Sequence, residues 1–509
     1  MSDKKRKLRS ALLLLGVSML MVLSACSGRS ATPEEPTGVF IQVDTPNPEQ
    51  QQATVEPISP TPPATSAPQV PVPTDTSSPT QEPQVQTVPM PLMGAESHRM
   101  TPPILNKIQN LGLNTIRHNA LLWSDVEPEK GARKWGAVKN LEKKLADAAK
   151  MDLNVILIVR STPAWAQKVP GSYCGPVKEE ELSAFAQFMS EAVSRYSQPP
   201  YNVKYWELGN EPDVDPSLVP GDSIFGCWGD QGDEYYGGGY YAEMLKAVYP
   251  AIKAADPDAK VLTGGLLLDC DPTNPPENKD CRQANFLEGI LKNGGGDYFD
   301  YVSFHGYPPY NGTLSWDEHY PDWEQRGGVV MGKVNFLQEV MARYNVDKPL
   351  IHTEGSLICP EWNSKNCNPP DEAFFEAQAD YAVILYVRNW AEGLAGTIWY
   401  QFEGPGWRYG GLLDKNQNPV KAYSSLQFLI SELKDTGFSR QLDTYPGVRA
   451  YEFVGTGKRV WVLWSDSGDP VTISVPDNLI GMYDKYGNPI ESAGAEVDIS
   501  SPVYMEITP

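Results

Sequence analysis

The stretch that decides the fold of this chain is Tyr205-Trp206-Glu207-Leu208-Gly209-Asn210-Glu211-Pro212-Asp213. It begins inside an apolar-rich run, residues 203–208, which has the length and the residue types of a buried strand. The run closes on an amide and a carboxylate, Asn210 and Glu211, and Pro212 then ends strand geometry. Polar side chains at the mouth of a buried strand cost free energy unless they are used. Asn210-Glu211-Pro212 by itself is also consistent with a solvated turn at a strand end.

A second stretch of the same kind lies far downstream. Residues 348–355, with the sequence KPLIHTEG, form another short apolar run that ends in a carboxylate, Glu354, and a glycine. Two glutamates at the ends of two strands suggest the paired carboxylates with which glycosidic bonds are hydrolysed. The pair of stretches therefore points to a chemistry that neither stretch indicates alone.

Apolar runs alternate with helical patterns over residues 85–436, as expected of parallel βα units. Residues 85–92 are the expected first strand, and residues 396–402 the expected eighth. Between them, residues 155–159 form a continuous apolar run, typical of a parallel strand covered on both faces. The alternation predicts an α/β fold, a (β/α)8 TIM barrel whose active site lies at the carboxyl ends of its strands.

The last part of the chain has a different pattern. Short β runs over residues 448–453, 459–464, 471–475 and 503–507 are separated by Gly, Asp and Ser turns. We therefore expect a small β-sandwich domain over residues 437–509. A structural role is expected for it, with glycan binding as the alternative.

The first residues predict a targeting segment. A basic start is followed by an apolar run over residues 11–23, which is short for a membrane span. The sequence Leu23-Ser24-Ala25-Cys26 then resembles the cleavage box of bacterial lipoproteins. The resemblance implies a signal peptide over residues 1–25 and a lipid on Cys26, with an ordinary secretory signal as the alternative.

Residues 26–84 are dominated by Pro, Thr, Ser, Gln and Glu. Such a segment cannot bury enough apolar surface to offset its ordering entropy, so we expect a disordered linker. We interpret it as a tether between the membrane and the folded part. The expected location is thus the outside of the cell membrane, with the lipid anchor as the only membrane contact.

Charge and cysteine content fit an exported protein. The chain carries 64 acidic against 42 basic residues, a net charge of −22, which argues against nucleic acid as a partner. Six cysteines remain besides Cys26, an even number that predicts disulfides. No CxxC motif or histidine cluster accompanies them, so we expect no metal and no cofactor. Near neighbours suggest the pairs Cys270–Cys281 and Cys359–Cys367, which leaves Cys174–Cys227.

Polar and aromatic side chains recur at the predicted carboxyl ends of the strands. Besides the two glutamates, they are Glu96, His98, Arg117, Arg160, Trp165, His305, Tyr307, Trp399 and Glu403. Because the active site of a TIM barrel is built at this end, these residues are the candidates for binding and catalysis.

Taken together, these residues resemble the clan A glycoside hydrolases, a retaining TIM-barrel group. The resemblance covers about residues 85–435 and implies that Glu211 is the acid/base and Glu354 the nucleophile. The arginine, histidine, tyrosine and tryptophan of the clan's strands two, six and eight match Arg117, His305, Tyr307 and Trp399.

Thr162-Pro163-Ala164-Trp165 is similar to families 39 and 42 of this clan. Family 39, with its xylosidases, iduronidases and exopolysaccharide hydrolases, is the nearer of the two. A histidine that some clan members carry on strand three is absent, and Arg160 lies nearby.

Physical chemistry assigns roles to the same residues. Desolvation and a second carboxylate should raise the pKa of Glu211, so that it holds a proton near neutral pH. Glu354 has to stay ionised to attack the anomeric carbon, and Tyr307 and Arg117 are the expected hydrogen-bond donors to it. Asn210 is expected to bind the sugar 2-hydroxyl group.

Three tryptophans, Trp165, Trp399 and Trp407, are candidate platforms for sugar rings, with packing in the core or at the rim as the alternative. His305 equally fits a buried histidine at the barrel mouth.

The sequence therefore predicts a retaining hydrolase that cleaves O-glycosidic bonds of a poly- or oligosaccharide by double displacement. Two alternatives remain open. One is a carbohydrate-binding lipoprotein without turnover, and the other is a transglycosylase that remodels cell-surface polysaccharide.

Overall fold

The structure is a computed structural model that describes residues 86–312, 317–360, 370–491 and 494–508. The signal peptide, Cys26 and the linker predicted over residues 26–84 lie outside these ranges. In the part of the chain that is described, no helix combines the length and the apolar character that a membrane crossing requires.

Eight parallel strands form the main sheet, in the order β6-β5-β4-β3-β2-β9-β8-β7. Their bounds are β2 Leu92–Glu96, β3 Thr115–Leu122, β4 Asn154–Arg160, β5 Tyr205–Asn210, β6 Lys260–Gly265, β7 Val302–Gly306, β8 Leu350–Gly355 and β9 Gly396–Trp399. The end strands of this order, β6 and β7, meet through the parallel bridges Leu262–Tyr301 and Leu266–Phe304. The sheet is thus closed, and the predicted TIM barrel is confirmed.

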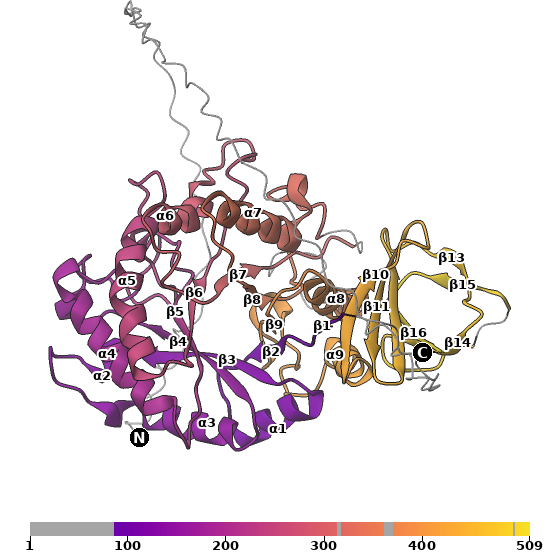
Figure 1. The fold of residues 1–509 in the computed structure, drawn as a ribbon, viewed down its shortest axis with the longest axis horizontal. Coiled ribbons are helices and arrows are strands. Elements are labelled where there is room, and N and C mark those ends of the chain that lie inside the picture. The colour runs from indigo at the N-terminus through magenta and orange to yellow at the C-terminus, as the bar shows by residue number, and fades with distance from the viewer. Residues whose placement is uncertain (1–85, 313–316, 361–369, 492–493, 509) are drawn as a thin grey trace, which may run out of the picture. The chain divides into compact units, whose positions relative to one another are not determined.

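Helices connect the strands and surround the barrel (Figure 1). They are α1 Pro102–Leu111, α2 Trp123–Val126, α3 Lys139–Ala149, α4 Leu182–Tyr196, α5 Gly238–Ala255, α6 Phe286–Lys292, α7 Val329–Arg343, α8 Glu372–Ala391 and α9 Lys421–Glu432. Helix α3 buries Leu141, Leu145 and Ala148, which recur at helical spacing on one face. The face opposite these three residues is more exposed, whereas helix α8 is buried on nearly all sides.

The interior of the barrel changes character along its axis. At one level, Ile156, Leu262, Ile351 and Ile398 form an apolar cluster of fully buried side chains. Side chains of a strand alternate between its two faces. Towards the carboxyl ends of the strands, the buried side chains include polar and charged groups, among them Arg117, Asn210 and Glu354. The apolar layer therefore closes the barrel below the polar mouth.

The C-terminal part folds into antiparallel sheets. A six-stranded sheet has the order β1-β10-β11-β12-β16-β14, and β13 pairs with β15. The bounds are β1 Val88–Pro89, β10 Thr436–Gln441, β11 Val448–Gly455, β12 Lys458–Ser465, β13 Val471–Ser474, β14 Leu479–Asp484, β15 Glu496–Ile499 and β16 Val503–Ile507. These sheets are consistent with the β-sandwich that the sequence predicts.

The C-terminal sheet packs on barrel helix α8. The rings of Trp390 and Phe453 lie 4.8 Å apart. In addition, Lys485 Nζ donates a hydrogen bond of 2.6 Å to the carboxylate of Asp380. Apolar packing and a buried ion pair thus join the two parts.

The first strand differs from the prediction. Residues 85–92 were expected to open the barrel, but β1 pairs with β10 of the C-terminal sheet and only β2, which begins at Leu92, belongs to the barrel. Pro89 and Pro91 explain the difference, because proline cannot donate to a strand ladder and interrupts a continuous strand. The segment therefore serves both sheets in succession.

Two disulfides hold the loops that follow the strands. Cys174–Cys227 joins the loop after β4 to the loop after β5, with 5.0 Å between the Cα atoms. Cys270–Cys281 closes part of the loop after β6, with 5.1 Å between the Cα atoms. Cys359 is also disulfide-bonded, and Cys367 lies outside the described residues, so the pair Cys359–Cys367 stays a prediction.

Peptide mapping without reductant should recover the pairs Cys174–Cys227, Cys270–Cys281 and Cys359–Cys367. Each bridge restricts the unfolded chain, so replacing both cysteines of one pair by serine should lower the free energy of unfolding by about 2–4 kcal/mol. Chemical denaturation measures that loss. Free thiols in the folded protein, or a different pairing, would contradict the assignment.

Candidate active site

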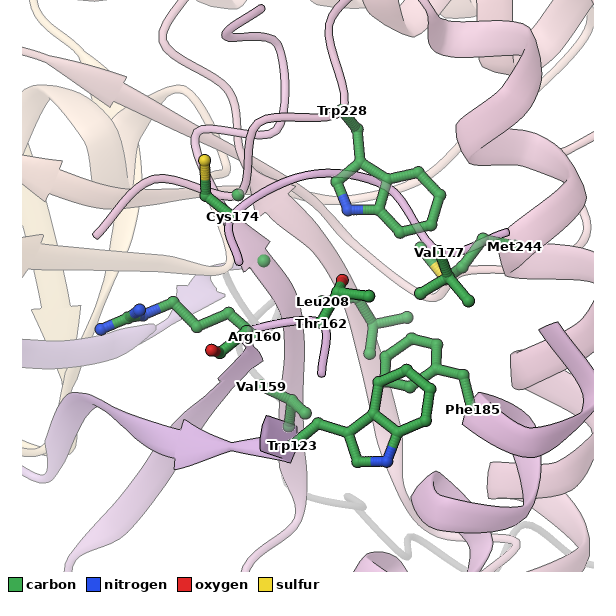
Figure 2. Close-up of a pocket in the computed structure, with 13 residues that line it drawn as sticks. Trp123, Val159, Arg160, Thr162, Cys174, Val177, Phe185, Leu208, Trp228 and Met244 are labelled. Atoms are coloured by element: carbon green, nitrogen blue, oxygen red, sulfur yellow. The ribbon is translucent and has the colours of Figure 1, made fainter. Parts of the chain in front are cut away.

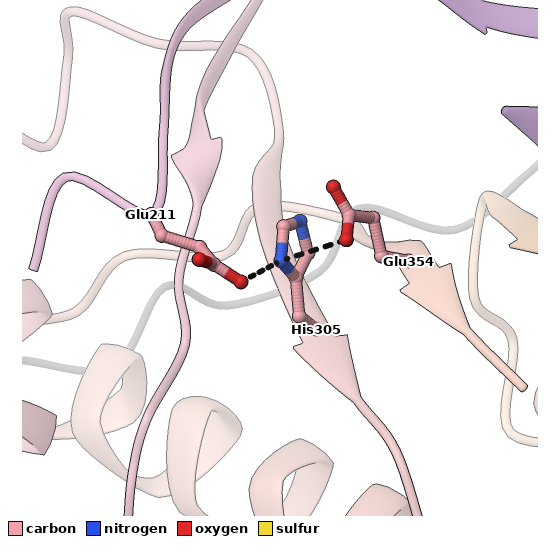
Figure 3. Close-up of side chains that lie close together, drawn as sticks. All are labelled: Glu211, His305 and Glu354. Atoms are coloured by element: carbon pink, nitrogen blue, oxygen red, sulfur yellow. Dashed lines mark hydrogen bonds and ion pairs between the residues drawn. The ribbon is translucent and has the colours of Figure 1, made fainter. Parts of the chain in front are cut away.

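Three side chains from three strands converge at the carboxyl end of the barrel (Figure 3). Glu211 directly follows β5, His305 lies in β7 and Glu354 lies in β8. One polar atom from each of the three lies within 4.8 Å of the other two. All three residues are buried, so the carboxylates interact in a medium that screens charge weakly.

His305 lies between the two glutamates. Its Nδ1 atom is 2.8 Å from Oε1 of Glu211 and 3.6 Å from Oε2 of Glu354. Burial lowers the pKa of His305 well below its ordinary value, and the charge of Arg117 lowers it further. The imidazole is therefore neutral and adds no positive charge to the pair.

A glycine on β6 makes room for this histidine. A Cβ atom at Gly265 would collide with Nε2 of His305 and also lie 2.8 Å from Oγ1 of Thr353. The ring could not then keep its place between the glutamates. Gly265 is thus required by close approach of a side chain, a requirement that the sequence does not reveal.

Arg117, on β3, is the cation of the site and is fully buried. Its Nε donates to Oε2 of Glu207 at 2.6 Å, and its Nη2 donates to Oδ1 of Asn210 at 2.8 Å. Its Nη1 donates to both Glu96 and Glu354. One guanidinium therefore links side chains from four strands, β2, β3, β5 and β8.

The two central glutamates have different partners. Glu354 accepts hydrogen bonds from Arg117 and from the hydroxyl group of Tyr307. Glu211 has the neutral His305 as its side-chain hydrogen-bond partner. Hydrogen bonds and a cation favour the ionised form of a carboxyl group, so the surroundings favour negative charge on Glu354 over negative charge on Glu211.

The pKa shifts have the same physical origin. Burial raises the pKa of Glu211 well above its ordinary value, and the negative charge of Glu354 raises it further. Burial also raises the pKa of Glu354, but Arg117 and the hydrogen bond from Tyr307 oppose that rise. When the pair holds one proton, that proton therefore resides on Glu211.

The three polar atoms also make the arrangement that a metal ion could use. However, Glu354 already bonds Arg117 and Tyr307, and Nδ1 of His305 already faces Glu211. A divalent cation would have to compete with the guanidinium for the same carboxylate. The expectation that no metal is needed stays a prediction.

The predicted tryptophans differ in position. Trp399 is fully buried and donates from Nε1 to the carbonyl of Gly410 at 2.7 Å, so no sugar can stack on it. The prediction of Trp399 as a platform is wrong, because Ile398 points into the barrel and its neighbour must point outward. The next residue, Tyr400, points inward instead, with its ring 5.8 Å from that of Tyr307.

Trp407 and Trp165 are placed differently again. Trp407 is 42% exposed, and its ring lies 5.2 Å from that of Tyr307, edge to face. Trp165 packs edge to face on Trp123, and its Nε1 donates to the carbonyl of Glu127 at 3.0 Å. Trp407 therefore lies beside the glutamate pair, whereas the contacts of Trp165 are those of packing.

A pocket lies next to the site, behind the loop that Cys174 holds (Figure 2). Trp123, Phe185 and Trp228 line it, and the side chain of Arg160 extends away from these rings. Neither glutamate of the pair lines this pocket. Its lining is mostly apolar, and we interpret it as a packing defect behind β4 and β5.

Sequence reasoning gave no role to Glu207 or Tyr400, and it named Glu96 as a candidate at a strand end without a partner. Glu207 accepts hydrogen bonds from Nε and Nη2 of Arg117, and Glu96 accepts one from Nη1. Glu207 lies on the same strand as Asn210, and a carboxylate inside a buried strand is itself a signal that a cation faces it. The contact of Glu96 with Arg117 depends on the pairing of β2 with β3 and carries no local signal.

The fold and this site define a class, the clan A glycoside hydrolases with a TIM barrel. The sequence model of the family described as Cellulase (glycosyl hydrolase family 5) matches residues 75–393. That match spans more than half of the chain, and the chain therefore belongs to this family. The clan predicted from the sequence is thus confirmed, and the enzyme is an O-glycosyl hydrolase.

Solved structures agree on the fold. A family 39 glycoside hydrolase from the gut symbiont Bacteroides cellulosilyticus WH2 superposes with a TM-score of 0.61 at 20% identity, over 82% of this chain and 81% of that one. A family 30 endoxylanase from Clostridium papyrosolvens C71 superposes with a TM-score of 0.55 at 12% sequence identity, over 84% of this chain and 98% of that one. A family 51 alpha-L-arabinofuranosidase from Bifidobacterium longum superposes with a TM-score of 0.53 at 14% sequence identity, over 84% of this chain and 98% of that one. No curated protein matches the sequence.

Replacing Glu207 by alanine should destabilise the fold strongly. The change leaves Nε of the fully buried Arg117 without its anion, and breaking a buried pair in this way costs about 3–5 kcal/mol. Chemical denaturation measures the loss. The matched control is Asp147→Ala, which removes surface pairs with Lys143 and Lys150 and should cost about 1 kcal/mol or less. Equal losses in the two variants would contradict the role given to Arg117.

Proposed function

We propose that this enzyme is a retaining glycoside hydrolase in which Glu211 is the acid/base and Glu354 the nucleophile. One observation carries the proposal: an oxygen of Glu211 lies within 4.8 Å of an oxygen of Glu354, yet of the two only Glu354 is bonded to a cation among the described residues. Retaining enzymes hold their two carboxyl groups about 5–5.5 Å apart, whereas inverting enzymes leave about 6.5–9.5 Å for a water molecule. The separation supports retention.

In the first step, a carboxylate oxygen of Glu354 attacks the anomeric carbon of the sugar. The bond from that carbon to the leaving oxygen breaks, and Glu211 gives its proton to the leaving oxygen. The product is a glycosyl ester of Glu354. Arg117 and Tyr307 hold the attacking carboxylate in one orientation through their hydrogen bonds, so less freedom is lost at the transition state.

In the second step, Glu211 is a carboxylate and takes a proton from water. The water oxygen attacks the anomeric carbon, and the bond to Glu354 breaks. The free enzyme is restored with the proton on Glu211. Each step inverts the anomeric carbon, and the two together retain its configuration.

Substrate binding is proposed for residues around the pair. Asn210 lies next to Glu211, and Arg117 fixes its Oδ1, which leaves its amide nitrogen to donate to a sugar hydroxyl group. Trp407 offers an exposed ring beside Tyr307, and Tyr400 adds a second ring at the same mouth. Aromatic faces of this kind suit the apolar faces of sugar rings.

Export is part of the proposal. Disulfides form and persist in oxidising compartments, and Cys174–Cys227 and Cys270–Cys281 support an extracytoplasmic enzyme. Attachment to the cell membrane through a lipid on Cys26 rests on the sequence Leu23-Ser24-Ala25-Cys26.

Substitution of the two glutamates tests the roles. Glu211→Gln and Glu354→Gln should each lower turnover of an unactivated glycoside by at least about 10²–10⁴-fold, because each keeps the shape and loses the ionisable group. With a dinitrophenyl glycoside, which needs no proton at its leaving group, Glu211→Ala should still form the glycosyl-enzyme. Added azide should then accelerate turnover and give a product of retained configuration.

Glu354→Ala should form no covalent intermediate, and azide should give an inverted product in that variant. Proton NMR of the azide products determines the configuration. The matched control is Glu127→Gln, a buried carboxylate paired with Arg133 away from the glutamate pair, which should keep wild-type turnover. Exchanged configurations would reverse the two roles, and unchanged turnover in both variants would refute the proposed function.

A further inference from the structure

One guanidinium nitrogen, Nη1 of Arg117, is shared by two carboxylates. It donates to Oε2 of Glu96 and to Oε1 of Glu354. Because both acceptors bind the same nitrogen, the two carboxylates are close neighbours, and negative charge on either one disfavours negative charge on the other. Glu96 is 2% exposed, so water screens this repulsion poorly.

The second carboxylate oxygen of Glu96 contacts a side chain that is exposed to solvent. Oε1 lies 2.9 Å from Nε2 of His98, whose side chain is 48% exposed. His98 can therefore exchange a proton with water while it bonds a buried carboxylate. The hydrogen bond to Glu96 raises the pKa of His98, so the contact favours the protonated imidazole.

Other charged and titratable groups face this pair of carboxylates. Around Glu96 and His98 they are Arg117, Arg160, Lys144, His118, Tyr400 and Glu403, and around Glu354 they are Arg117, Tyr307, His305, Glu211 and Tyr400. Burial raises the pKa of Glu96, but Arg117 and His98 outweigh burial and lower it. Glu96 is consequently ionised whenever the proposed nucleophile is.

We propose that Glu96 and His98 are positioning residues that set the charge state of Glu354 through the shared nitrogen of Arg117. When His98 is neutral, the full charge of Glu96 competes with Glu354 for the guanidinium. When His98 is protonated, the imidazolium offsets Glu96, and Arg117 favours the ionised form of Glu354. The inference rests on the proposed function, in which Glu354 must be ionised to react.

Two substitutions should move the acidic limb of the pH profile in opposite directions. Glu96→Gln removes a negative charge beside Glu354, so the pH at which kcat/KM falls by half should move lower by about one unit. His98→Gln keeps a hydrogen-bond donor for Glu96 but cannot be protonated. The charge of Glu96 then stays unopposed in acid, and the limb should move to higher pH.

The experiment measures kcat/KM against pH on a dinitrophenyl glycoside, so that proton donation by Glu211 does not limit the rate. In the double variant Glu96→Gln/His98→Gln, the histidine change should shift the limb less than it does alone, because its partner charge is absent. The matched control is Glu127→Gln, a carboxylate that is likewise 2% exposed and paired with an arginine, Arg133. It should leave the limb where it is.

A purely structural role would lower kcat/KM by the same factor at every pH. An unmoved limb in Glu96→Gln, or shifts of the same sign in the two single variants, would overturn the inference. Glu354→Gln is assayed in parallel, because it distinguishes a failure of this inference from a failure of the proposed function. If that variant keeps wild-type turnover, the proposed function itself fails.

A second measurement covers the case in which Glu96→Gln does not fold. The chain has five histidines, and NMR of the imidazole nitrogens can follow the titration of His98. The charge of Glu354 contributes to the raised pKa of His98, so Glu354→Gln should lower that pKa. An unchanged titration of His98 would contradict the coupling.

Discussion

The ion pairs of Arg117 are the interaction on which the rest of this active site depends. A fully buried guanidinium is costly unless its hydrogen-bond donors meet acceptors. Here Glu207 accepts from Nε and Nη2, Asn210 accepts from Nη2, and Glu96 and Glu354 share Nη1. The contacts join β2, β3, β5 and β8, so the same interaction that satisfies the cation also fixes the mouth of the barrel.

The number of charges explains why the two central glutamates differ. Glu96, Glu207, Glu211 and Glu354 lie around one arginine, and a further buried cation, Lys333, has its pKa lowered by burial to about 8. Lys333 donates to the backbone carbonyls of Leu267 and His305 and leaves the carboxylates to Arg117. Four carboxylates cannot all stay ionised at such low screening. Glu211 has no lysine or arginine partner among the described residues, so a proton is held there at the lowest free-energy cost.

Sequence patterns were sufficient for the parts of this account that are local. Asn210-Glu211 and Glu354 stand at the ends of apolar runs, and the structure brings these residues together at one end of the barrel. The alternation of apolar runs with helical patterns likewise predicts the barrel from local sequence. Both follow from hydrophobic periodicity, which each segment carries in itself.

Other features depend on strand register or on contacts between distant segments. Trp399 and Tyr400 are adjacent aromatic residues. A register shift of one residue in β9 would turn Trp399 towards the mouth of the barrel and Tyr400 away from it. Only the position of Ile398 inside the barrel decides between them. The sharing of Arg117 between Glu96 and Glu354 needs three strands in place, and no spacing in the sequence encodes it.

The most direct test of the central claim is to identify the residue that carries the sugar. An activated 2-fluoro glycoside forms a long-lived ester with a nucleophilic carboxylate, and peptide mass spectrometry locates that ester. The account predicts a single labelled peptide with the sugar on Glu354, and no label when Arg117 is replaced by alanine and the orientation of Glu354 is lost. A sugar on Glu211, Glu207 or Glu96 in the wild-type enzyme would contradict it.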